Sequence, residues 1–331
     1  MKFQSGGYII LLISCLLSVG CDDKEGINPE GLFPPLGAAF SSAGGEVTFF
    51  NLSTGDIVDT RSLNGHYTQS ASFSLSGTFL YLTDNHADNV AIYSLPAFEF
   101  SASLPNGGAP IDLCINRAAT QVYLINANGN LRRYNQIDGG VDTVAVGLQP
   151  RRLALTPIEE RHVWIACRGD SSVYIVDLNG FFCSDTLRFE SPPSDIRFSP
   201  DGNLAYIALQ DEEGIRVFDA HTYEENEDNE LDAGPGPMDL AINRDGTVLV
   251  ASDSTLGQVR VYNLVNHGDW SLAVGGSAGR VRFSRNQMFY VISCEENIVI
   301  SVNSASVPPM IADTVCVPPT VRELALWETQ P

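Results

Sequence analysis

Residues 193–207 read PSDIRFSPDGNLAYI, and this stretch contains the pattern on which most of the chain is built. Ile196 and Phe198 stand two positions apart, so their side chains share one face of a β-strand. Residues 199–202 (SPDG) then supply Pro, Asp and Gly, which provide the backbone angles of a tight turn. A second apolar run follows at residues 205–207. The stretch therefore predicts a strand, a turn and a second strand.

The same order recurs along the chain at intervals of 40 to 44 residues. Each copy can be aligned on one anchor residue, with an apolar residue three positions later and another five positions later. The anchors are Thr68, Pro110, Pro150, Pro193, Pro237, Ala278 and Val321. Both apolar positions hold in all seven copies, and a period of this length is typical of repeat architectures.

Each complete copy has room for four short strands. After the turn and the second strand comes a third strand of mixed character, as in Val173–Leu178, and then a more polar fourth strand. No helical period interrupts the repeat. Four antiparallel strands in about 42 residues are typical of one blade of a β-propeller.

The two ends of the chain determine the number of blades. Before Thr68 the sequence predicts three strands, and after Cys316 it predicts one. These are Ala38–Ser42, Val47–Leu52, Ile57–Leu63 and Arg322–Trp327. We therefore predict an all-β fold: a seven-bladed β-propeller of four-stranded antiparallel blades, in which three strands from the beginning and one from the end complete a shared blade. Closing the ring in this way removes exposed sheet edges.

Parts of the repeat resemble a known family. Residues 81–85 (YLTDN), followed by residues 89–93 (NVAIY), are similar to the repeat of the YVTN family of seven-bladed propellers, and residues 173–177 (VYIVD) resemble its second half. The similarity covers about residues 37–327, although no copy contains the literal tetrapeptide. WD40 repeats fit less well because no blade ends in Trp-Asp. The resemblance implies a propeller outside the cytoplasm and implies no single activity.

The beginning of the chain has the features of an export signal. Lys2 precedes the nearly uncharged stretch Tyr8–Val19, whose 12 residues are too few to span a bilayer as a helix, which needs about 20. Residues 17–21 (LSVGC) resemble a lipobox, although Ser18 stands where the motif prefers Leu. The resemblance implies that residues 1–20 are removed and that Cys21 carries a lipid. The alternative is an ordinary signal peptide followed by a chance cysteine.

Residues 21–36 are first acidic and then rich in Pro and Gly, which predicts an unstructured tether ahead of a propeller at residues 37–331. Acidic residues directly after a lipidated cysteine resemble two sorting signals with opposite results. One retains lipoproteins at the inner membrane, and the other directs them to the cell surface. We therefore expect a lipid-anchored protein of the bacterial cell envelope, on its periplasmic face or at its surface.

The formal net charge of −21 argues against nucleic-acid binding, because phosphate contacts need Lys and Arg. We expect a monomer that meets a protein or small-molecule partner. Besides Cys15 in the signal and Cys21, five cysteines remain, and an odd number leaves at least one thiol unpaired. The five histidines show no metal-binding spacing, so no resident cofactor is predicted.

Candidate ligand-binding residues stand two positions after each anchor. Apart from Ser70, they are all charged: Asp112, Arg152, Asp195, Asp239, Arg280 and Glu323. Four acids and two bases at one depth around an axis predict a polar funnel. In the alternative interpretation, these side chains bond to the turns of their own blade or pair with a neighbouring blade.

The loops joining second to third strands are also acidic, and such oxygen ligands suit calcium. The residues concerned are Asp84, His86, Asp88, Asp170, Asp211, Glu212, Glu213, Asp253, Glu295 and Glu296. No calcium-loop motif is present, so calcium is only a candidate.

Three functions remain in competition at this point. The first is a membrane-anchored binding or scaffold module, and the second is a lactonase-like hydrolase, because lactone hydrolases occur among similar propellers. A hydrolase would have to use Arg152, Arg280, Asp195 and Asp239 at the axis. The third is a sensor that docks to a periplasmic machine. The regular ring and the missing nucleophile motifs favour binding.

Overall fold

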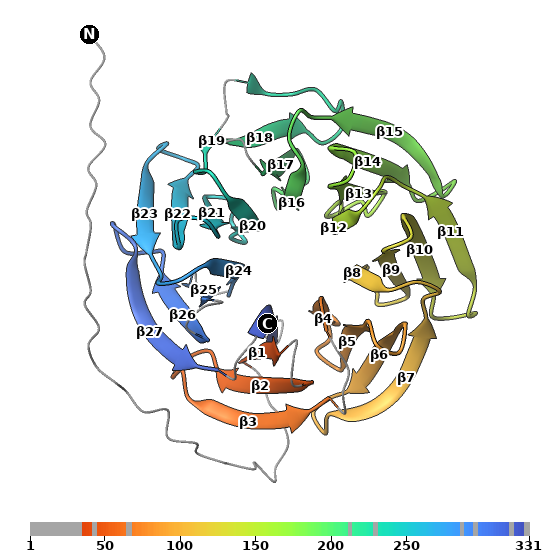
Figure 1. The fold of residues 1–331 in the computed structure, drawn as a ribbon, viewed down its shortest axis with the longest axis horizontal. Coiled ribbons are helices and arrows are strands. Elements are labelled where there is room, and N and C mark those ends of the chain that lie inside the picture. The colour runs from red at the N-terminus through yellow and green to blue at the C-terminus, as the bar shows by residue number, and fades with distance from the viewer. Residues whose placement is uncertain are drawn as a thin grey trace.

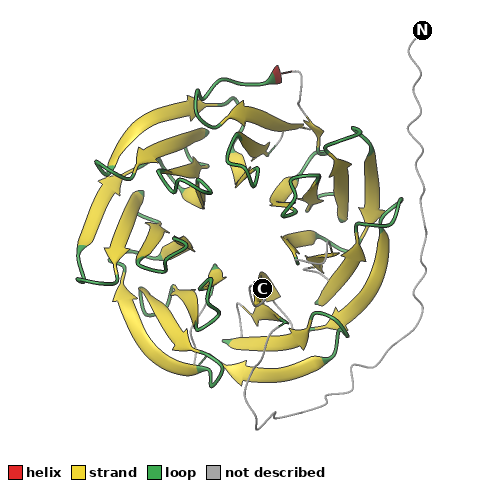
Figure 2. Cartoon of the chain, turned by 180° about the vertical axis from the view of Figure 1, so that it is seen from behind, coloured by secondary structure: helices red, strands yellow, loops and turns green. Residues whose placement is uncertain are grey.

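The computed structural model describes residues 35–41, 45–63, 68–210, 214–227, 231–284, 288–293, 297–317 and 321–327. The predicted signal peptide, Cys21 and nearly all of the predicted tether lie outside these residues. Nearly all the described residues are in strands or in the loops that connect them (Figure 2). None of the described helical residues forms a segment long and apolar enough to cross a membrane.

The described residues form seven four-stranded antiparallel sheets arranged as the blades of a ring (Figure 1). This confirms the predicted seven-bladed β-propeller. The innermost strands around the ring are β4 (Ala71–Phe73), β8 (Pro110–Ile115), β12 (Pro150–Leu155), β16 (Pro193–Phe198), β20 (Pro237–Ile242), β24 (Ala278–Phe283) and β28 (Val321–Trp327). Six of these seven strands begin at the predicted anchor, and β4 begins three residues after Thr68.

In each blade the other three strands lie outward of the innermost strand and follow one another in chain order. The second strands are β5 (Phe79–Asp84), β9 (Gln121–Asn126), β13 (His162–Cys167), β17 (Leu204–Leu209), β21 (Val248–Asp253), β25 (Met288–Ser293) and β1 (Leu36–Ser41). The third strands are β6 (Asn89–Ser94), β10 (Asn130–Asn135), β14 (Ser172–Asp177), β18 (Gly214–Asp219), β22 (Gln258–Asn263), β26 (Ile298–Asn303) and β2 (Glu46–Asn51). The outer strands are β7 (Glu99–Pro105), β11 (Val141–Ala145), β15 (Phe182–Arg188), β19 (Leu231–Asp232), β23 (Asp269–Ala273), β27 (Met310–Cys316) and β3 (Ile57–Ser62).

The ring closes through the blade that the two ends of the chain share. Its strand order is β28-β1-β2-β3, so the last strand of the chain is the innermost strand of the blade that begins it. The pairing is antiparallel, with Ala39 opposite Leu324 and Ala38 opposite Ala325. On its other sides β28 contacts β24 and β4, the innermost strands of the neighbouring blades. The predicted closure by three strands and one strand is confirmed.

The hydrophobic core lies between neighbouring blades. One cluster, for example, joins Tyr81 and Val90 of one blade to Leu113 and Leu124 of the next. Trp164 is completely buried, at 0% exposure, in another such layer. Because each blade buries both of its faces against neighbours, the stability of every blade depends on the ring being complete.

The turns after the innermost strands have the predicted chemistry. The Ser199 hydroxyl accepts a hydrogen bond from Leu204 N (2.9 Å), and Gly202 has a φ of 76°, which few other residues adopt. Asn243 Oδ1 accepts from Thr247 N and Val248 N in the equivalent turn. We call the side of the disc that carries these turns, at residues 74–78, 116–120, 156–161, 199–203 and 243–247, the turn face. The loops joining second to third strands lie on the opposite side, the loop face, because the strands alternate in direction.

Candidate functional site

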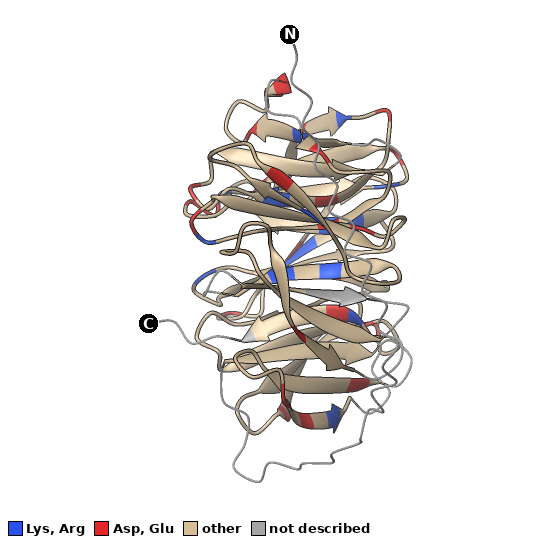
Figure 3. Ribbon diagram, turned by 90° about the vertical axis from the view of Figure 1, so that its left-hand side faces the viewer, with Lys and Arg blue, Asp and Glu red and all other residues tan. Residues whose placement is uncertain are grey.

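The structure brings the predicted candidate residues together at the axis of the ring. All of them are buried, with exposed fractions between 0% and 8%: Ser70, Asp112, Arg152, Asp195, Asp239, Arg280 and Glu323. Each belongs to an innermost strand or stands directly before one. Figure 3 shows the disc edge-on, with Lys and Arg residues on its strands as well as on its loops.

Three of the four candidate carboxylates bind the backbone of the next blade. In each case the carboxylate accepts the N–H that lies one residue beyond the equivalent position of the neighbouring innermost strand. The bonds are Leu153 N to Asp112 Oδ2 (3.0 Å), Leu240 N to Asp195 Oδ2 (2.7 Å) and Val281 N to Asp239 Oδ2 (2.9 Å). These acids therefore connect blades, as the alternative interpretation of the sequence anticipates.

Asp239 is at the centre of a buried network of ion pairs. Arg280 Nη1 lies 3.1 Å from Asp239 Oδ1, and Arg282 Nη1 lies 2.6 Å from Oδ2. Both arginines also pair with Glu323, at 3.0 Å and 2.8 Å. Asp239 is 0% exposed and Glu323 is 1% exposed. Their carboxylates therefore contact arginine side chains in place of water.

The two neighbouring acids Asp195 and Asp239 have different pKa values. Burial raises the pKa of Asp195 to about 6. The Asp239 carboxylate also raises this pKa, and Arg197 lowers it in part. Burial would also raise the pKa of Asp239, but Arg282 and Arg197 outweigh it, and the pKa of Asp239 is lowered. Asp195 Oδ1 has no hydrogen-bond partner in the described part of the protein, which agrees with its weaker stabilisation as an anion.

The raised pKa of Asp195 predicts a particular dependence of stability on pH. An unfolded Asp titrates near 4, so the folded protein binds the extra proton between about pH 4 and 6. Below pH 4 the contribution of Asp195 to the free energy of unfolding should be fully present. It should fall by roughly 1–3 kcal/mol as the pH rises through 6. In Asp195→Asn this part of the slope should disappear.

Urea unfolding at half-unit steps between pH 4 and pH 7.5 measures the effect. Asp185→Asn, which changes an exposed carboxyl on the outer strand β15, is the matched control and should keep the wild-type slope. Equal slopes in wild type and Asp195→Asn would contradict the prediction.

Two axial arginines were missed in the sequence analysis. Arg197 and Arg282 stand four positions after their anchors, and so on the same strand face as the predicted residues. The period-2 alternation could have identified them, but at this position the other blades carry only Ser72, Cys114, Ala154, Ala241 and Ala325. Both side chains are 26% exposed, whereas Asp195 and Asp239 are 0% exposed.

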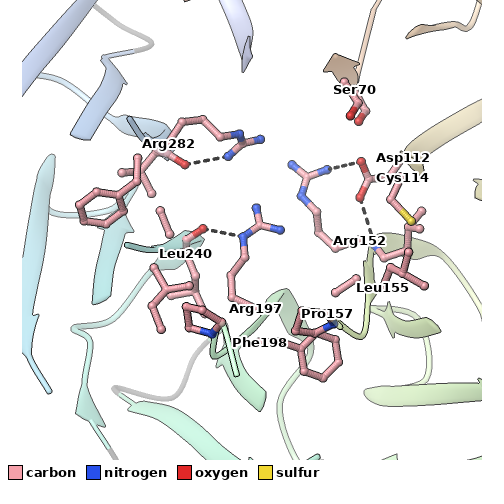
Figure 4. Close-up of a pocket in the computed structure, with 18 of the residues that line it drawn as sticks. Ser70, Asp112, Cys114, Arg152, Leu155, Pro157, Arg197, Phe198, Leu240 and Arg282 are labelled. Atoms are coloured by element: carbon pink, nitrogen blue, oxygen red, sulfur yellow. Dashed lines mark hydrogen bonds and ion pairs between the residues drawn. The ribbon is translucent and has the colours of Figure 1, made fainter. Parts of the chain in front are cut away.

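A cavity of about 520 Å³ opens along the axis (Figure 4). Of the predicted residues, Ser70, Asp112 and Arg152 line it; Asp195, Asp239, Arg280 and Glu323 do not. Its charged lining consists of Asp112, Arg152, Arg197, Arg244 and Arg282, and its apolar lining includes Leu155, Phe198, Ile242 and Phe283. The volume is typical of small-molecule sites, which combine an apolar wall with a few polar groups.

The cavity extends toward the turn face. Its lining runs from Ser70 and Asp112 near the starts of the innermost strands to Pro157, Pro200 and Arg244 in the turns that follow those strands. The acidic loops that the sequence offered as candidates lie on the opposite face. The hollow extends toward the turn face because that half of the axis is lined mainly by Ser, Cys and Ala, whose side chains leave space.

Cys114 lines the cavity without the properties of a nucleophile. Burial raises the pKa of its thiol well above the usual value, and the carboxylates of Asp112 and Glu160 raise it further. A thiol in such surroundings stays protonated and unreactive. The other free thiols in the described residues include Cys167, which is buried, and Cys183 on an outer strand. Cys294 lies outside the described residues.

The described acids of the loop face already accept hydrogen bonds from the protein. Asp84 Oδ1 accepts from His86 N and Ala87 N, and Asp253 Oδ1 makes the same contacts with Thr255 N and Leu256 N. Asp88 binds Gly108 N, and Asp170 accepts the Tyr174 hydroxyl. Within the described residues, no group of three or more His, Cys, Asp or Glu side chains is arranged to hold a metal ion. Asp211, Glu212, Glu213, Glu295 and Glu296 lie outside them.

No protein-family model matches the sequence, and no curated protein does. Solved structures resemble the fold at low identity. A functionally unknown protein of Desulfotomaculum acetoxidans matches with a TM-score of 0.74 and 14% identity, over 90% of this chain and 100% of its own. A protein of Bacteroides fragilis proposed to be a 6-phosphogluconolactonase matches with a TM-score of 0.72 and 15% identity, over 87% and 96%.

Hydrazine synthase of Kuenenia stuttgartiensis matches with a TM-score of 0.69 and 13% identity, over 80% of this chain and 91% of the matched chain. In all, 1777 solved chains match, so the fold is too common to indicate one activity. These likenesses show that the chain has the fold of a seven-bladed β-propeller.

Proposed function

We propose that this protein is an exported lipoprotein of the bacterial cell envelope, anchored by Cys21, whose propeller binds a small polar ligand in its axial cavity. The sequence supports the anchor through the 12-residue apolar stretch and the lipobox-like residues 17–21. The similarity of residues 81–93 and 173–177 to the YVTN repeat supports a location outside the cytoplasm. The cavity of about 520 Å³ is the observation that supports ligand binding.

Binding is favoured over catalysis because the axial acids are already engaged. Asp195 and Asp239 are 0% exposed, and each accepts a backbone N–H of the next blade. A general base must reach its substrate, and neither carboxylate lines the cavity. Cys114 lines the cavity with a raised pKa and does not provide a nucleophile.

The anchor is tested by metabolic labelling with an alkyne-modified palmitate in a bacterial host. The full chain should take up label, and Cys21→Ser should not, because the thiol that receives the lipid is gone. Cys114→Ser is the matched control and should be labelled like the wild type. Equal labelling of Cys21→Ser would contradict lipidation. An impermeant reagent applied to intact cells then distinguishes the cell surface from the periplasmic face.

A lactonase-like hydrolase is the second candidate, supported by the similarity in fold to the proposed 6-phosphogluconolactonase. Hydrolysis of 6-phosphogluconolactone by the full-length protein in detergent decides between the two. We expect no turnover above the spontaneous rate. Turnover that disappears in a folded Asp195→Asn variant would replace the binding proposal with the hydrolase.

A further inference from the structure

We infer that the ligand of the axial cavity is a small anion whose carboxylate or phosphate oxygens are held by Arg152, Arg197 and Arg282. The inference rests on the proposed function, since it names the chemical class of the ligand for the same cavity. In Figure 4 the side chains of these arginines point into the space at the axis.

The charge of the cavity wall is opposite to that of the protein. Among the lining residues in the described part of the protein, the basic side chains are Arg152, Arg197, Arg244 and Arg282, and the only acid is Asp112. The chain as a whole has a formal charge of −21. A basic interior in so acidic a protein is unfavourable for cations and favourable for an anion that enters it.

The buried acids behind the wall do not cancel this charge. Asp195, Asp239 and Glu323 together with the lining Asp112 give four carboxylates. These acids pair with Arg152, Arg197, Arg280 and Arg282, and Arg244 adds a fifth arginine on the exposed part of the lining. Arg197 and Arg282 are each 26% exposed, whereas the three acids behind them are 0% or 1% exposed. A ligand in the cavity therefore meets guanidinium groups and, of these four carboxylates, only that of Asp112.

Arg152 has a buried hydrogen-bond donor without a partner in the described part of the protein. Its side chain is only 5% exposed, and its Nε has no hydrogen-bond partner. The nearest oxygens of Asp112, Asp195 and Asp239 lie 3.8 to 4.0 Å from it, which is too far for a hydrogen bond. Its one bond runs from Nη1 to Arg151 O at 3.3 Å. An unmet buried donor on a cation is costly, and an oxyanion drawn against the Arg152 guanidinium would offset its charge.

The rest of the wall suits an organic anion. Phe198, Phe283, Leu155 and Ile242 supply apolar surface beside the arginines. Guanidinium groups bind carboxylate and phosphate oxygens in pairs, so both classes of anion fit the same seat. The expected ligand is a small organic acid or phosphate ester whose uncharged part lies against this apolar surface.

Isothermal titration of the full-length protein in detergent tests the inference with inorganic phosphate, butyrate and the neutral isostere butyramide. We expect phosphate or butyrate to bind, and butyramide to bind at least about tenfold more weakly because it lacks the charge. A response to phosphate alone identifies a phosphate seat, and a response to butyrate identifies a carboxylate seat.

Two variants at one position separate charge from shape. Ser72 lines the cavity on β4, at the position that corresponds to Arg197 and Arg282. Ser72→Glu places a carboxylate of the protein in the arginine seat, so it should raise the melting temperature and weaken anion binding at least about tenfold. Ser72→Gln has the same size without the charge and should keep most of the binding.

Arg197→Gln should also weaken anion binding. Arg188→Gln, on the outer strand β15, should leave anion binding unchanged. Butyramide binding as tightly as butyrate would overturn the anion inference and leave the proposed ligand-binding function intact. If none of the three probes binds to the folded protein, both are overturned. Anion binding that is equal in Ser72→Glu and Ser72→Gln would overturn the assignment of the seat.

Discussion

Deletion of residues 321–331 is expected to abolish the cooperative thermal transition of the full-length protein. The deletion removes β28, the innermost strand of the shared blade, and with it the contacts to β1, β24 and β4. Val321 and Leu324 are 1% and 0% exposed, so their burial is lost as well. Glu323 disappears from its pairs with Arg280 and Arg282 and leaves buried charge without a partner.

The expected loss is about 5–10 kcal/mol, which is comparable to the whole stability of a typical domain. Differential scanning calorimetry and near-ultraviolet circular dichroism measure it. Deletion of residues 328–331 alone spares β28 and is the matched control, with a melting temperature close to the wild type. Leu324→Asp should destabilise the protein in the same direction without shortening it. A deletion of 321–331 that melts like the wild type would show that the ring does not need its closing strand.

Asp239→Ala is expected to have the second largest effect. Its carboxylate contacts Arg280 and Arg282 within 3.1 Å, lies near Arg152 and Arg197, and accepts Val281 N. Alanine would leave these guanidinium groups buried against one another with less compensating charge. Breaking a buried pair from one side costs about 3–5 kcal/mol, which corresponds to a fall of roughly 10 °C in the melting temperature.

Asp232→Ala is the matched control for this substitution. Asp232 also pairs with an arginine, Arg260, at 2.6 Å, but its side chain is 68% exposed on the outer strand β19. Solvent screens such a pair, so the melting temperature should change by less than about 2 °C. A fall in Asp239→Ala no larger than that in Asp232→Ala would show that the axial network contributes little to stability.

The innermost strands could be located closely from the sequence because their pattern is local. Two apolar residues at a spacing of two mark β16 and β20 within the chain itself, and the turns at residues 199–202 (SPDG) and 243–246 (NRDG) follow them. The repeat carried this assignment to strands of weaker pattern, such as β24. β4 begins three residues after its anchor Thr68, because pairing with a neighbour and not local propensity determines where a strand starts.

The axial site was only partly predictable. The ring from Ser70 to Glu323 follows from the repeat, since equivalent positions on blades of the same topology meet at the axis. Arg197 and Arg282 occupy another ring of equivalent positions, whose other members are small residues. Because most copies of the repeat have no charge at this position, the repeat did not predict a charged ring there. Which acids pair, and which face water, depends on distances between strands that are about 40 residues apart in sequence.

By itself, the sequence determined the repeat, the number of blades, the strand that closes the ring and the residues that meet at the axis. These depend on periodicity and on the number of strands at each end of the chain. Only the tertiary structure decided that Asp195 and Asp239 are buried and do not line the cavity, whereas arginines do. The physical reason is that burial and pairing arise between blades, where each charge responds to neighbours that no local pattern records.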